Sequence, residues 1–406
     1  MLLRCYPKIT EFIYELFNQA PAADYRFVPI YSYGFFVACG FFSAAYFAVK
    51  EMKRRESLGL LAGNTVEVTL SNNYTLVQII LYSVLAFVVS YKIIGIVAYQ
   101  PQLSSGTIAF NSYMLSLKQG NLLGGILIGL TTAYLFYSKK KGSVRQIEKK
   151  IVTIHPSDNI GDLVLIAAIL GILGAAFFNY LENPGDYVNF NKDPIGSLFS
   201  GLSVFGGLIC AGLGFAGYAY WKKFDVIHFI DSIAPGYVLA NGIGRIGCQV
   251  AGDGDWGVAN FHAKPSWLPD FLWRDNYAYH IINCNPAIDI SIPDCINADN
   301  CCQLANAAYP TPLYEFAMCA TIFLILWAIR KRITYMPGML FSVFMILIGI
   351  QRFTIEQLRD LSGRNTYSFL NIQLRQSEII SMVMTLAGII LAAYLWRKFN
   401  SNTKIR

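Results

Sequence analysis

The amino-acid sequence contains nine apolar runs long enough to cross a lipid bilayer as helices. A crossing helix needs about 17–25 predominantly apolar residues, because the hydrocarbon layer is about 30 Å thick. Only 14% of the 406 residues are charged, against about 25% in a soluble domain. We therefore expect an all-α polytopic membrane protein. The predicted spans cover residues 27–49, 74–99, 122–138, 160–181, 195–220, 227–248, 312–329, 337–355 and 378–396.

Lysine and arginine residues follow every odd-numbered span, and this pattern predicts the orientation. Cytoplasmic loops carry the excess of these residues, so we expect the N-terminus outside and the C-terminus in the cytoplasm. Anchoring of this kind accounts for the net charge of +7, and no basic surface for nucleic acid is indicated. The main groups are Lys50, Lys53, Arg54, Arg55, Lys139, Lys140, Lys141, Lys222, Lys223, Arg330, Lys331, Arg332, Arg397 and Lys398.

The largest segment between spans is expected to form a small extracytoplasmic cap that contains four cysteines. An oxidising compartment permits disulfides, and four cysteines allow three pairings. A zinc site that uses His280 is the alternative, although the spacing lacks a paired CxxC. The four cysteines are Cys284, Cys295, Cys301 and Cys302.

The segment Asn241–Gly257, which reads NGIGRIGCQVAGDGDWG, places charges among glycines at the end of an apolar span. Charges at membrane depth are expensive and usually functional. Glycines let a backbone or a lipid headgroup approach closely. We interpret Arg245, Asp253 and Asp255 as part of a functional site, with a polar loop that merely ends a helix as the alternative.

More polar residues fall at the same expected outer leaflet. Arg352 and Glu356 are spaced i, i+4 and can pair on one helical face, either in a site or as an interfacial anchor. Converging arginines suit a phosphate, because the guanidinium fork matches phosphate oxygens. The sequence therefore predicts a lipid-phosphate site. Its expected members are Arg245, Asp253, Tyr309, Glu315, Arg352, Glu356 and Arg359.

Five short blocks carry a resemblance to a known family when they are read in order. They are Tyr33-Gly34, Gly206-Gly207-Leu208, Gly244-Arg245-Ile246-Gly247 with Gly252-Asp253, Tyr309-Pro310-Thr311-Pro312-Leu313-Tyr314-Glu315, and Arg352-Phe353-Thr354-Ile355-Glu356-Gln357-Leu358-Arg359. Together they resemble motifs of the bacterial prolipoprotein diacylglyceryl transferases, over about residues 27–56 and 159–396. The resemblance implies a seven-helix core, with an additional span pair inserted within residues 63–155.

These inferences predict a division of the chain into six parts. They are an N-terminal extracytoplasmic or interfacial segment (1–26), a first core span (27–62), the inserted span pair with a basic cytoplasmic linker (63–156), core spans with the glycine-rich signature (157–257), the cap (258–310) and the C-terminal core spans (311–406).

The resemblance implies transfer of a diacylglyceryl group from phosphatidylglycerol to the lipobox cysteine of preprolipoprotein signal peptides, with release of glycerol 1-phosphate. It places the chain in the bacterial inner membrane and requires neither a cofactor nor a metal. The catalytic residues are then expected to be Arg245, Arg352, Asp253 and Glu315. Substrate-binding residues are expected to be Arg245, Tyr33, Gly247, Tyr309, Tyr314, Glu356 and Arg359.

The chain departs from the family pattern at several polar positions. Phe205 and Tyr309 stand where many members carry histidine, and Cys248 replaces the usual asparagine of the signature. Asp253 replaces the more usual glutamate, and Ala176 stands where many members place arginine or lysine. The identity of the general base is therefore left open.

Two other functions use the same residues. A lipid or anion transporter would bind a passing anion through the arginines, although transporters often show internal repeats and midplane charges that we do not find in the sequence. A catalytically silent homologue would bind phospholipid or lipoprotein precursor without transfer. A serine lipid hydrolase is disfavoured, because the sequence has no GxSxG motif.

Overall fold

The computed structural model confirms a mainly helical polytopic membrane protein. It describes residues 5–16, 31–71, 76–104, 113, 116, 118–142, 147–182, 203–293, 301–359, 366–369 and 372–404. Among these residues, seven helices are long and apolar enough to cross a membrane. They are Ser32–Ser57, Ile79–Ala98, Pro156–Leu181, Val226–Ala251, Thr311–Ile329, Met339–Glu356 and Gln376–Ser401. The expected count of nine crossing helices is not confirmed.

The two predicted spans outside these seven are nevertheless helical. Helix α6 covers Leu122–Gly142, but its apolar part ends at Ser138, where a run of lysines begins. Helix α9 covers Val204–Trp221, and the first part of the span predicted there lies outside the described residues.

The chain divides into two compact units. Unit 1 contains the described residues within 1–8, 31–64 and 154–406, and unit 2 contains those within 9–30 and 65–153. All the residues predicted for the functional site fall in unit 1.

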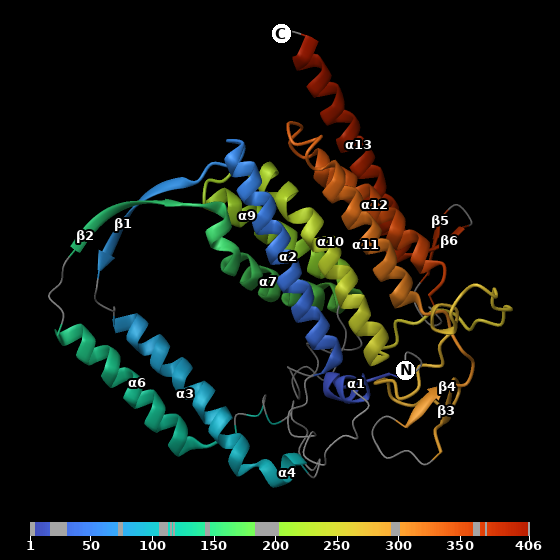
Figure 1. The fold of residues 1–406 in the computed structure, drawn as a ribbon, viewed down its shortest axis with the longest axis horizontal. Coiled ribbons are helices and arrows are strands. Elements are labelled where there is room, and N and C mark those ends of the chain that lie inside the picture. The colour runs from blue at the N-terminus through green and yellow to red at the C-terminus, as the bar shows by residue number, and fades with distance from the viewer. Residues whose placement is uncertain are drawn as a thin grey trace. The chain divides into compact units, whose positions relative to one another are not determined.

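Unit 1 is a bundle of long helices around α10 (Figure 1). Helix α10 packs most extensively against α2 and α11, while α12 packs against α13 and α7 against α9. The elements in chain order are α2 (Ser32–Ser57), the short 3₁₀ helix η2 (Pro156–Asn159), α7 (Ile160–Glu182), α9 (Val204–Trp221), α10 (Val226–Ala251), η4 (Asp270–Leu272), β3 (Asp289–Ser291), β4 (Cys302–Leu304), α11 (Thr311–Ile329), α12 (Met339–Glu356), β5 (Thr366–Phe369), β6 (Ile372–Arg375) and α13 (Gln376–Lys404).

Glycines set the close approach of α2 and α10. A Cβ at Gly40 would lie 2.8 Å from the carbonyl oxygen of Ala240, and one at Gly236 would lie 2.7 Å from that of Ala44. Small residues of this kind let membrane helices pack backbone to backbone. The contact holds α10, which carries the glycine-rich signature at its end, firmly against α2.

The helices bury an apolar core and leave apolar side chains on the outside. Val238 of α10, Leu326 of α11 and Leu340 of α12 are fully buried in the largest cluster. Leu386 and Ile390 of α13 are largely exposed. Exposed apolar faces on this scale would be a liability in water, and they fit helices that face lipid.

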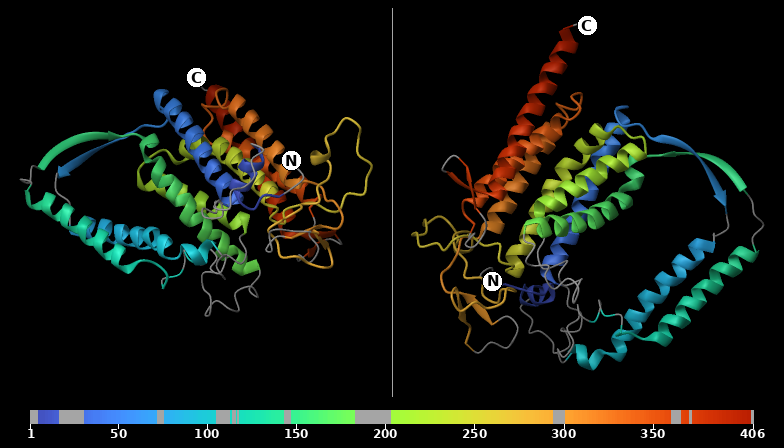
Figure 2. Two further views of the ribbon diagram at one scale, coloured as in Figure 1. Left: turned by 60° about the horizontal axis from the view of Figure 1, so that its bottom comes forward. Right: turned by 180° about the vertical axis from the view of Figure 1, so that it is seen from behind.

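The cap connects the end of α10 to the start of α11. It contains the antiparallel hairpin β3–β4, with Ile290 paired to Gln303. In the right-hand view of Figure 2 the cap gathers at one end of the unit 1 helices, and the C-terminal end of α13 projects at the other. Residues 5–8 pack against the cap, since the N–H of Cys5 donates to the carbonyl of Ala278 at 2.7 Å.

Unit 2 contains the inserted helix pair. Helices α3 (Leu76–Ala98) and α6 pack together, α4 spans Gln100–Ser104, and β1 (Asn64–Ser71) pairs with β2 (Ile147–Ile154). A short helix α1 covers Ile9–Leu16, within the segment 1–26 that the sequence predicts to be extracytoplasmic or interfacial. The ammonium group of Lys92 in α3 donates to the carbonyls of Tyr113 and Gln119 at 2.7 and 2.8 Å.

Candidate functional site

The C-terminal end of α10 turns sharply and brings an aspartate back onto Arg245. Helix α10 ends at Gly252, whose φ is +66°, and Gly254 follows with a φ of +93°. Such values strongly favour glycine. The turn places the carboxylate of Asp255 against the guanidinium of Arg245 in an ion pair.

The start of α11 supplies the central carboxylate. Glu315 lies in the first turns of this helix, which begins after Pro310 with Pro312 near its N-terminus. One oxygen of Glu315 lies 2.8 Å from Nε of Arg245. The side chain of Glu315 is only 1% exposed, so its charge depends on the arginines around it.

The end of α12 contributes two more arginines. Arg352 Nη1 lies 3.6 Å and Arg359 Nη1 3.9 Å from the second oxygen of Glu315. Arg352 Nη2 also pairs with Glu356 at 3.1 Å, and Arg359 pairs with Asp255. Three arginines and three carboxylates from three segments therefore form one continuous cluster.

Backbone bridges hold the end of α12 against the signature. Gly257 and Arg359 form an antiparallel bridge, and the N–H of Val258 donates to the carbonyl of Leu358 at 2.9 Å. The hydroxyl of Thr311 donates to the carbonyl of Asp255 at 2.6 Å. A side chain at Gly257 would clash with the Leu358 carbonyl at 2.6 Å, which explains the glycine.

The structure brings together five residues that the sequence predicts for the site: Arg245, Glu315, Arg352, Glu356 and Arg359. The carboxylate that bridges two of these arginines is Asp255. It is named in the signature but absent from the predicted catalytic set, which contains Asp253. Asp253 instead accepts a hydrogen bond from the N–H of Asp255 at 3.3 Å.

Tyr33 and Gly247 meet where α2 crosses the end of α10. A Cβ at Gly247 would lie 3.2 Å from Cα of Tyr33 and 3.0 Å from Cβ of Phe36. Gly247 thus allows the helices to touch. The side chain of Tyr33 is about half exposed.

Tyr309 and Tyr314 both contact the cap. The ring of Tyr309 packs edge-on against Trp273 at 5.8 Å, and its N–H donates to the carbonyl of Val258 at 3.2 Å. The hydroxyl of Tyr314 donates to the carbonyl of Leu272 at 2.7 Å. In this structure Tyr314 therefore ties the cap to α11, and its predicted contact with a headgroup stays a prediction.

The departures from the family pattern fall in different places. The thiol of Cys248 is buried in α10, and its sulfur lies within 4.8 Å of a carboxylate oxygen of Asp253. Ala176 is buried in α7. Phe205 lies in α9, next to Gly206, where a Cβ would lie 2.4 Å from the carbonyl oxygen of Gly174. Close packing of α7 and α9 accounts for the glycines of this block.

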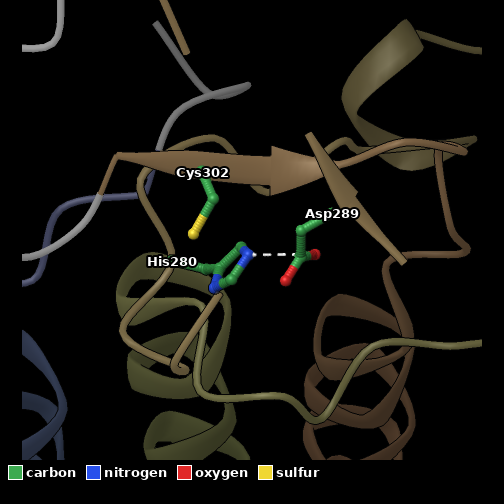
Figure 3. Close-up of side chains that lie close together, drawn as sticks. All are labelled: His280, Asp289 and Cys302. Carbon is green, nitrogen blue, oxygen red and sulfur yellow. Dashed lines mark ion pairs between the residues drawn. The ribbon is translucent and has the colours of Figure 1, made fainter. Parts of the chain in front are cut away.

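The cap contains a cluster of His280, Asp289 and Cys302 whose ligand-type atoms lie within 4.8 Å of one another (Figure 3). Nε2 of His280 lies 3.4 Å from Oδ1 of Asp289. The sulfur of Cys302, however, is bonded to that of Cys284, and zinc is bound by thiolates. The prediction of disulfides is thus confirmed for this pair and favoured over zinc. Cys301 is also disulfide-bonded, and Cys295 lies outside the described residues.

A buried polar group links the cap to α10. Asp275 accepts hydrogen bonds from Nε2 of Gln249 at 2.8 Å and from the N–H of Tyr277 at 2.9 Å. The hydroxyl of Tyr277 in turn donates to Gln249 at 2.8 Å. Burial nevertheless raises the pKa of Asp275 from its ordinary value of 3.8 to about 6.

The arrangement can bind a tetrahedral oxyanion such as the phosphate of a lipid headgroup. Arg245, Arg352 and Arg359 present guanidinium groups from two helix ends within reach of one carboxylate, Glu315. Guanidinium forks match phosphate oxygens and stabilise charge that develops on a leaving group. The second group of ligand-type atoms among the described residues, Cys248, Asp253 and Asp255, lies beside these arginines.

Comparisons with known proteins agree on one family. A family model described as prolipoprotein diacylglyceryl transferase matches residues 142–394. A protein of Streptococcus uberis named phosphatidylglycerol–prolipoprotein diacylglyceryl transferase is 27% identical over 266 residues, covering 65% of this chain and 86% of that protein. A protein of the same name from Streptococcus pyogenes serotype M5 is 27% identical over 270 residues, with 65% and 86% covered. The matched residues include all three segments that form the arginine cluster.

Proposed function

The chain belongs to the prolipoprotein diacylglyceryl transferase family, and we propose that it transfers the diacylglyceryl group of phosphatidylglycerol to the lipobox cysteine thiol of preprolipoproteins. The observation that carries this proposal is the convergence of Arg245, Arg352 and Arg359 on Glu315. A transporter would need a route for its anion past the bundle, whereas these groups gather at one end of it.

The proposed reaction is a substitution at carbon. The cysteine sulfur forms a bond to the glycerol carbon of the diacylglyceryl group, and the bond from that carbon to the phosphate oxygen breaks. Glycerol 1-phosphate leaves with the electron pair. Arg245 and Arg352, with Arg359 beside them, stabilise its charge in the transition state, and each such donor can contribute about 3–4 kcal/mol.

The remaining carboxylates divide the supporting roles. Glu315 and Glu356 are buried and paired with arginines, so they position the guanidinium groups. Asp253 is the proposed acceptor of the thiol proton, because it lies beside the cluster and the described ion pairs of the arginines go to other acids. A thiolate is the required nucleophile.

The location follows the same proposal. We place the site at the outer leaflet of a bacterial inner membrane, with the N-terminus outside and the C-terminus in the cytoplasm. The cap disulfide Cys284–Cys302 supports this orientation, since disulfides persist outside the cytoplasm. Labelling of cysteines introduced into the cap from the cytoplasmic side alone would overturn it.

The test is direct transfer by the purified protein in nanodiscs. We expect a synthetic lipobox peptide to gain the mass of the diacylglyceryl group when phosphatidylglycerol is present, with one glycerol 1-phosphate released per transfer. Diacylglycerol in place of phosphatidylglycerol is the control, because it lacks the leaving phosphate. A folded protein that gives no product with phosphatidylglycerol would refute the proposed function.

A pH–rate profile then tests the proton acceptor. Asp253→Asn should remove the acidic limb of the profile, where protonation of the acceptor slows transfer, or abolish transfer altogether, whereas Glu315→Gln should lower the rate without moving the profile. An unchanged profile in Asp253→Asn would assign the proton to another acceptor.

A further inference from the structure

Asp255 differs from the other carboxylates of the arginine cluster in its access to water. Its side chain is 26% exposed, whereas those of Glu315 and Glu356 are 1% exposed. It bridges Arg245 and Arg359 through its two oxygens. We propose that Asp255 is a displaceable counterion, which occupies the place of a phosphate between these arginines and swings out when a phosphate-bearing lipid binds.

The charges of the arginine cluster are balanced while Asp255 is in place. The described ion pairs join three arginines to three carboxylates, Asp255, Glu315 and Glu356, which leaves no net charge for an anionic phosphate. Among these ion-paired groups, departure of Asp255 leaves a surplus of one positive charge, which matches the single negative charge of a phosphodiester. Buried unbalanced charge is costly, and a phosphate that entered the neutral cluster would leave one negative charge unpaired. Phosphate binding is therefore favoured when one carboxylate leaves.

Of the three carboxylates, only Asp255 can move out of the cluster without disrupting buried contacts. Glu356 accepts a hydrogen bond from the hydroxyl of Ser377 at 2.6 Å and pairs with Arg352 at 3.1 Å. Glu315 is enclosed by three guanidinium groups. Moving either one would take a carboxylate through packed protein, whereas Asp255 already reaches solvent.

The neighbouring acid favours the same movement. Asp253 and Asp255 have carboxylate oxygens within 4.8 Å of each other, and like charges at this distance repel. A phosphate that entered with both carboxylates in place would add a third negative group. Rotation of Asp255 towards water relieves this repulsion.

The backbone around Asp255 stays in place while the side chain moves. The hydroxyl of Thr311 holds the Asp255 carbonyl at 2.6 Å, and the N–H of Gly257 donates to the Tyr309 carbonyl at 2.9 Å. The displacement of Asp255 is therefore a change of side-chain rotamer. It makes Asp255 a specificity-determining residue, since only a ligand that carries its own anionic group can replace the carboxylate between the arginines.

The first experiment measures lipid binding to the full-length protein in mixed micelles, and it rests on the proposed function only for the choice of lipid. For Asp255→Asn we expect the Kd for phosphatidylglycerol to fall about fivefold, because two partly exposed ion pairs no longer compete. The Kd for glycerol 1-phosphate should fall by a similar factor, which distinguishes an effect on the headgroup from an effect on the acyl chains. Diacylglycerol has no phosphate, so its Kd should be the same for Asp255→Asn and for wild type.

Two variants control this measurement. Asp270→Asn removes one charge from the cap at a side chain that is 63% exposed and paired with Lys264, and it should leave every Kd unchanged. Asp255→Glu keeps the charge and should bind phosphatidylglycerol within twofold of wild type. An unchanged or weaker affinity in Asp255→Asn, or an equal gain for diacylglycerol, would show that Asp255 is a fixed structural ion and overturn the proposal.

A second experiment uses wild-type protein, so it does not depend on the folding of a variant. Carbodiimide labelling of carboxyl groups, read by mass spectrometry, should increase at Asp255 when phosphatidylglycerol is added and stay constant at Asp270. Constant or reduced labelling at Asp255 would refute the displacement. Displacement in a protein that transfers no diacylglyceryl group would leave this inference standing and remove the proposed function instead.

Discussion

Two buried charge clusters lie along α10, and they differ in how tightly each is closed. The arginine cluster described above lies at the C-terminal end of the helix. An anchor cluster of Glu51, Arg55, Asp231 and Arg330 lies near its N-terminal end. Asp231 and Arg245 are 14 residues apart, or about 21 Å along a helix. Both clusters join the same helices, α10, α11 and α12, and the anchor cluster also includes α2.

In the anchor cluster every carboxylate oxygen is hydrogen-bonded, although Nη2 of Arg55 has no hydrogen-bond partner among the described residues. Glu51 pairs with Arg55 at 3.0 Å and with Arg330 at 3.1 Å, and Arg55 pairs with Asp231 at 3.3 Å. Asp231 also accepts the N–H groups of Gly338 and Phe341 at 3.0 and 2.9 Å, which satisfies the open N-terminus of α12. The side chains of Glu51 and Arg55 are fully buried.

The arginine cluster is looser. The second oxygen of Glu315 accepts no hydrogen bond among the described residues and lies 3.6 and 3.9 Å from two guanidinium groups. Asp255 is open to solvent. The same residue types therefore form a structural clamp in the anchor cluster, where every carboxylate oxygen accepts a short hydrogen bond. They form a binding site in the arginine cluster, where one carboxylate oxygen accepts none and the guanidinium groups lie farther away.

Removal of Asp231 should give the largest effect, and it should be on stability. Asp231→Ala leaves Arg55 without one carboxylate and leaves two N–H groups at the start of α12 without their acceptor. We expect a loss of about 3–5 kcal/mol of folding free energy, measured by denaturation in detergent. Transfer per folded molecule should stay near wild type. A stable but inactive Asp231→Ala would contradict the conclusion that the anchor cluster serves stability and the arginine cluster serves transfer.

Removal of Arg245 should give a loss of similar size in rate. Arg245→Ala should lower transfer about 10²–10³-fold, or about 3–4 kcal/mol of transition-state stabilisation, because the leaving phosphate loses a donor. The melting temperature in detergent serves as the control. Arg245→Lys should restore little, since a point charge lacks the bidentate fork. Wild-type rates in folded Arg245→Ala would move the phosphate elsewhere.

Sequence patterns predicted the helices and the arginines well, for physical reasons. Apolar runs of membrane length leave a chain few options apart from helices, and all nine predicted runs overlap helices. Motif spacing then identified Arg245 and Arg352. The role of Asp255 depends on the left-handed turn at Gly254. The family motif that identifies Arg245 ends at Gly252-Asp253, so it does not reveal this turn or the aspartate after it.

The anchor cluster is not apparent from the sequence. The lysine and arginine pattern predicts Arg54 and Arg55 in a basic loop after the first span, but both lie in the last turn of α2, which extends to Ser57. The partner of Arg55, Asp231, lies 176 residues away in sequence, beyond any local pattern. The i, i+4 spacing of Glu51 and Arg55 was the available signal.

The disulfide of the cap should stabilise the end of the bundle that contains the arginine cluster. Cys284 and Cys302 close a loop with a sequence separation of 18, which corresponds to about 3 kcal/mol of stabilisation in chain-entropy terms. Cys284→Ser with Cys302→Ser should lower stability by that order, as measured by denaturation. Non-reducing mass spectrometry should find the bond in wild type, and free thiols at both positions would contradict the structure.

The smallest predicted effect is a pH dependence of stability that belongs to the cap. The folded pKa of Asp275 is raised to about 6, so between pH 4 and 6 the folded protein holds a proton that the unfolded chain has released. Its contribution therefore falls as pH rises through this window, by a change on the order of 2 kcal/mol. Asp275→Asn should flatten this part of the stability curve, measured by thermal denaturation across pH, while Asp270→Asn should not. If the wild-type curve rises over the same window and Asp275→Asn leaves it unaltered, the hydrogen bonds from Gln249 and Tyr277 outweigh burial, and the carboxylate is held charged.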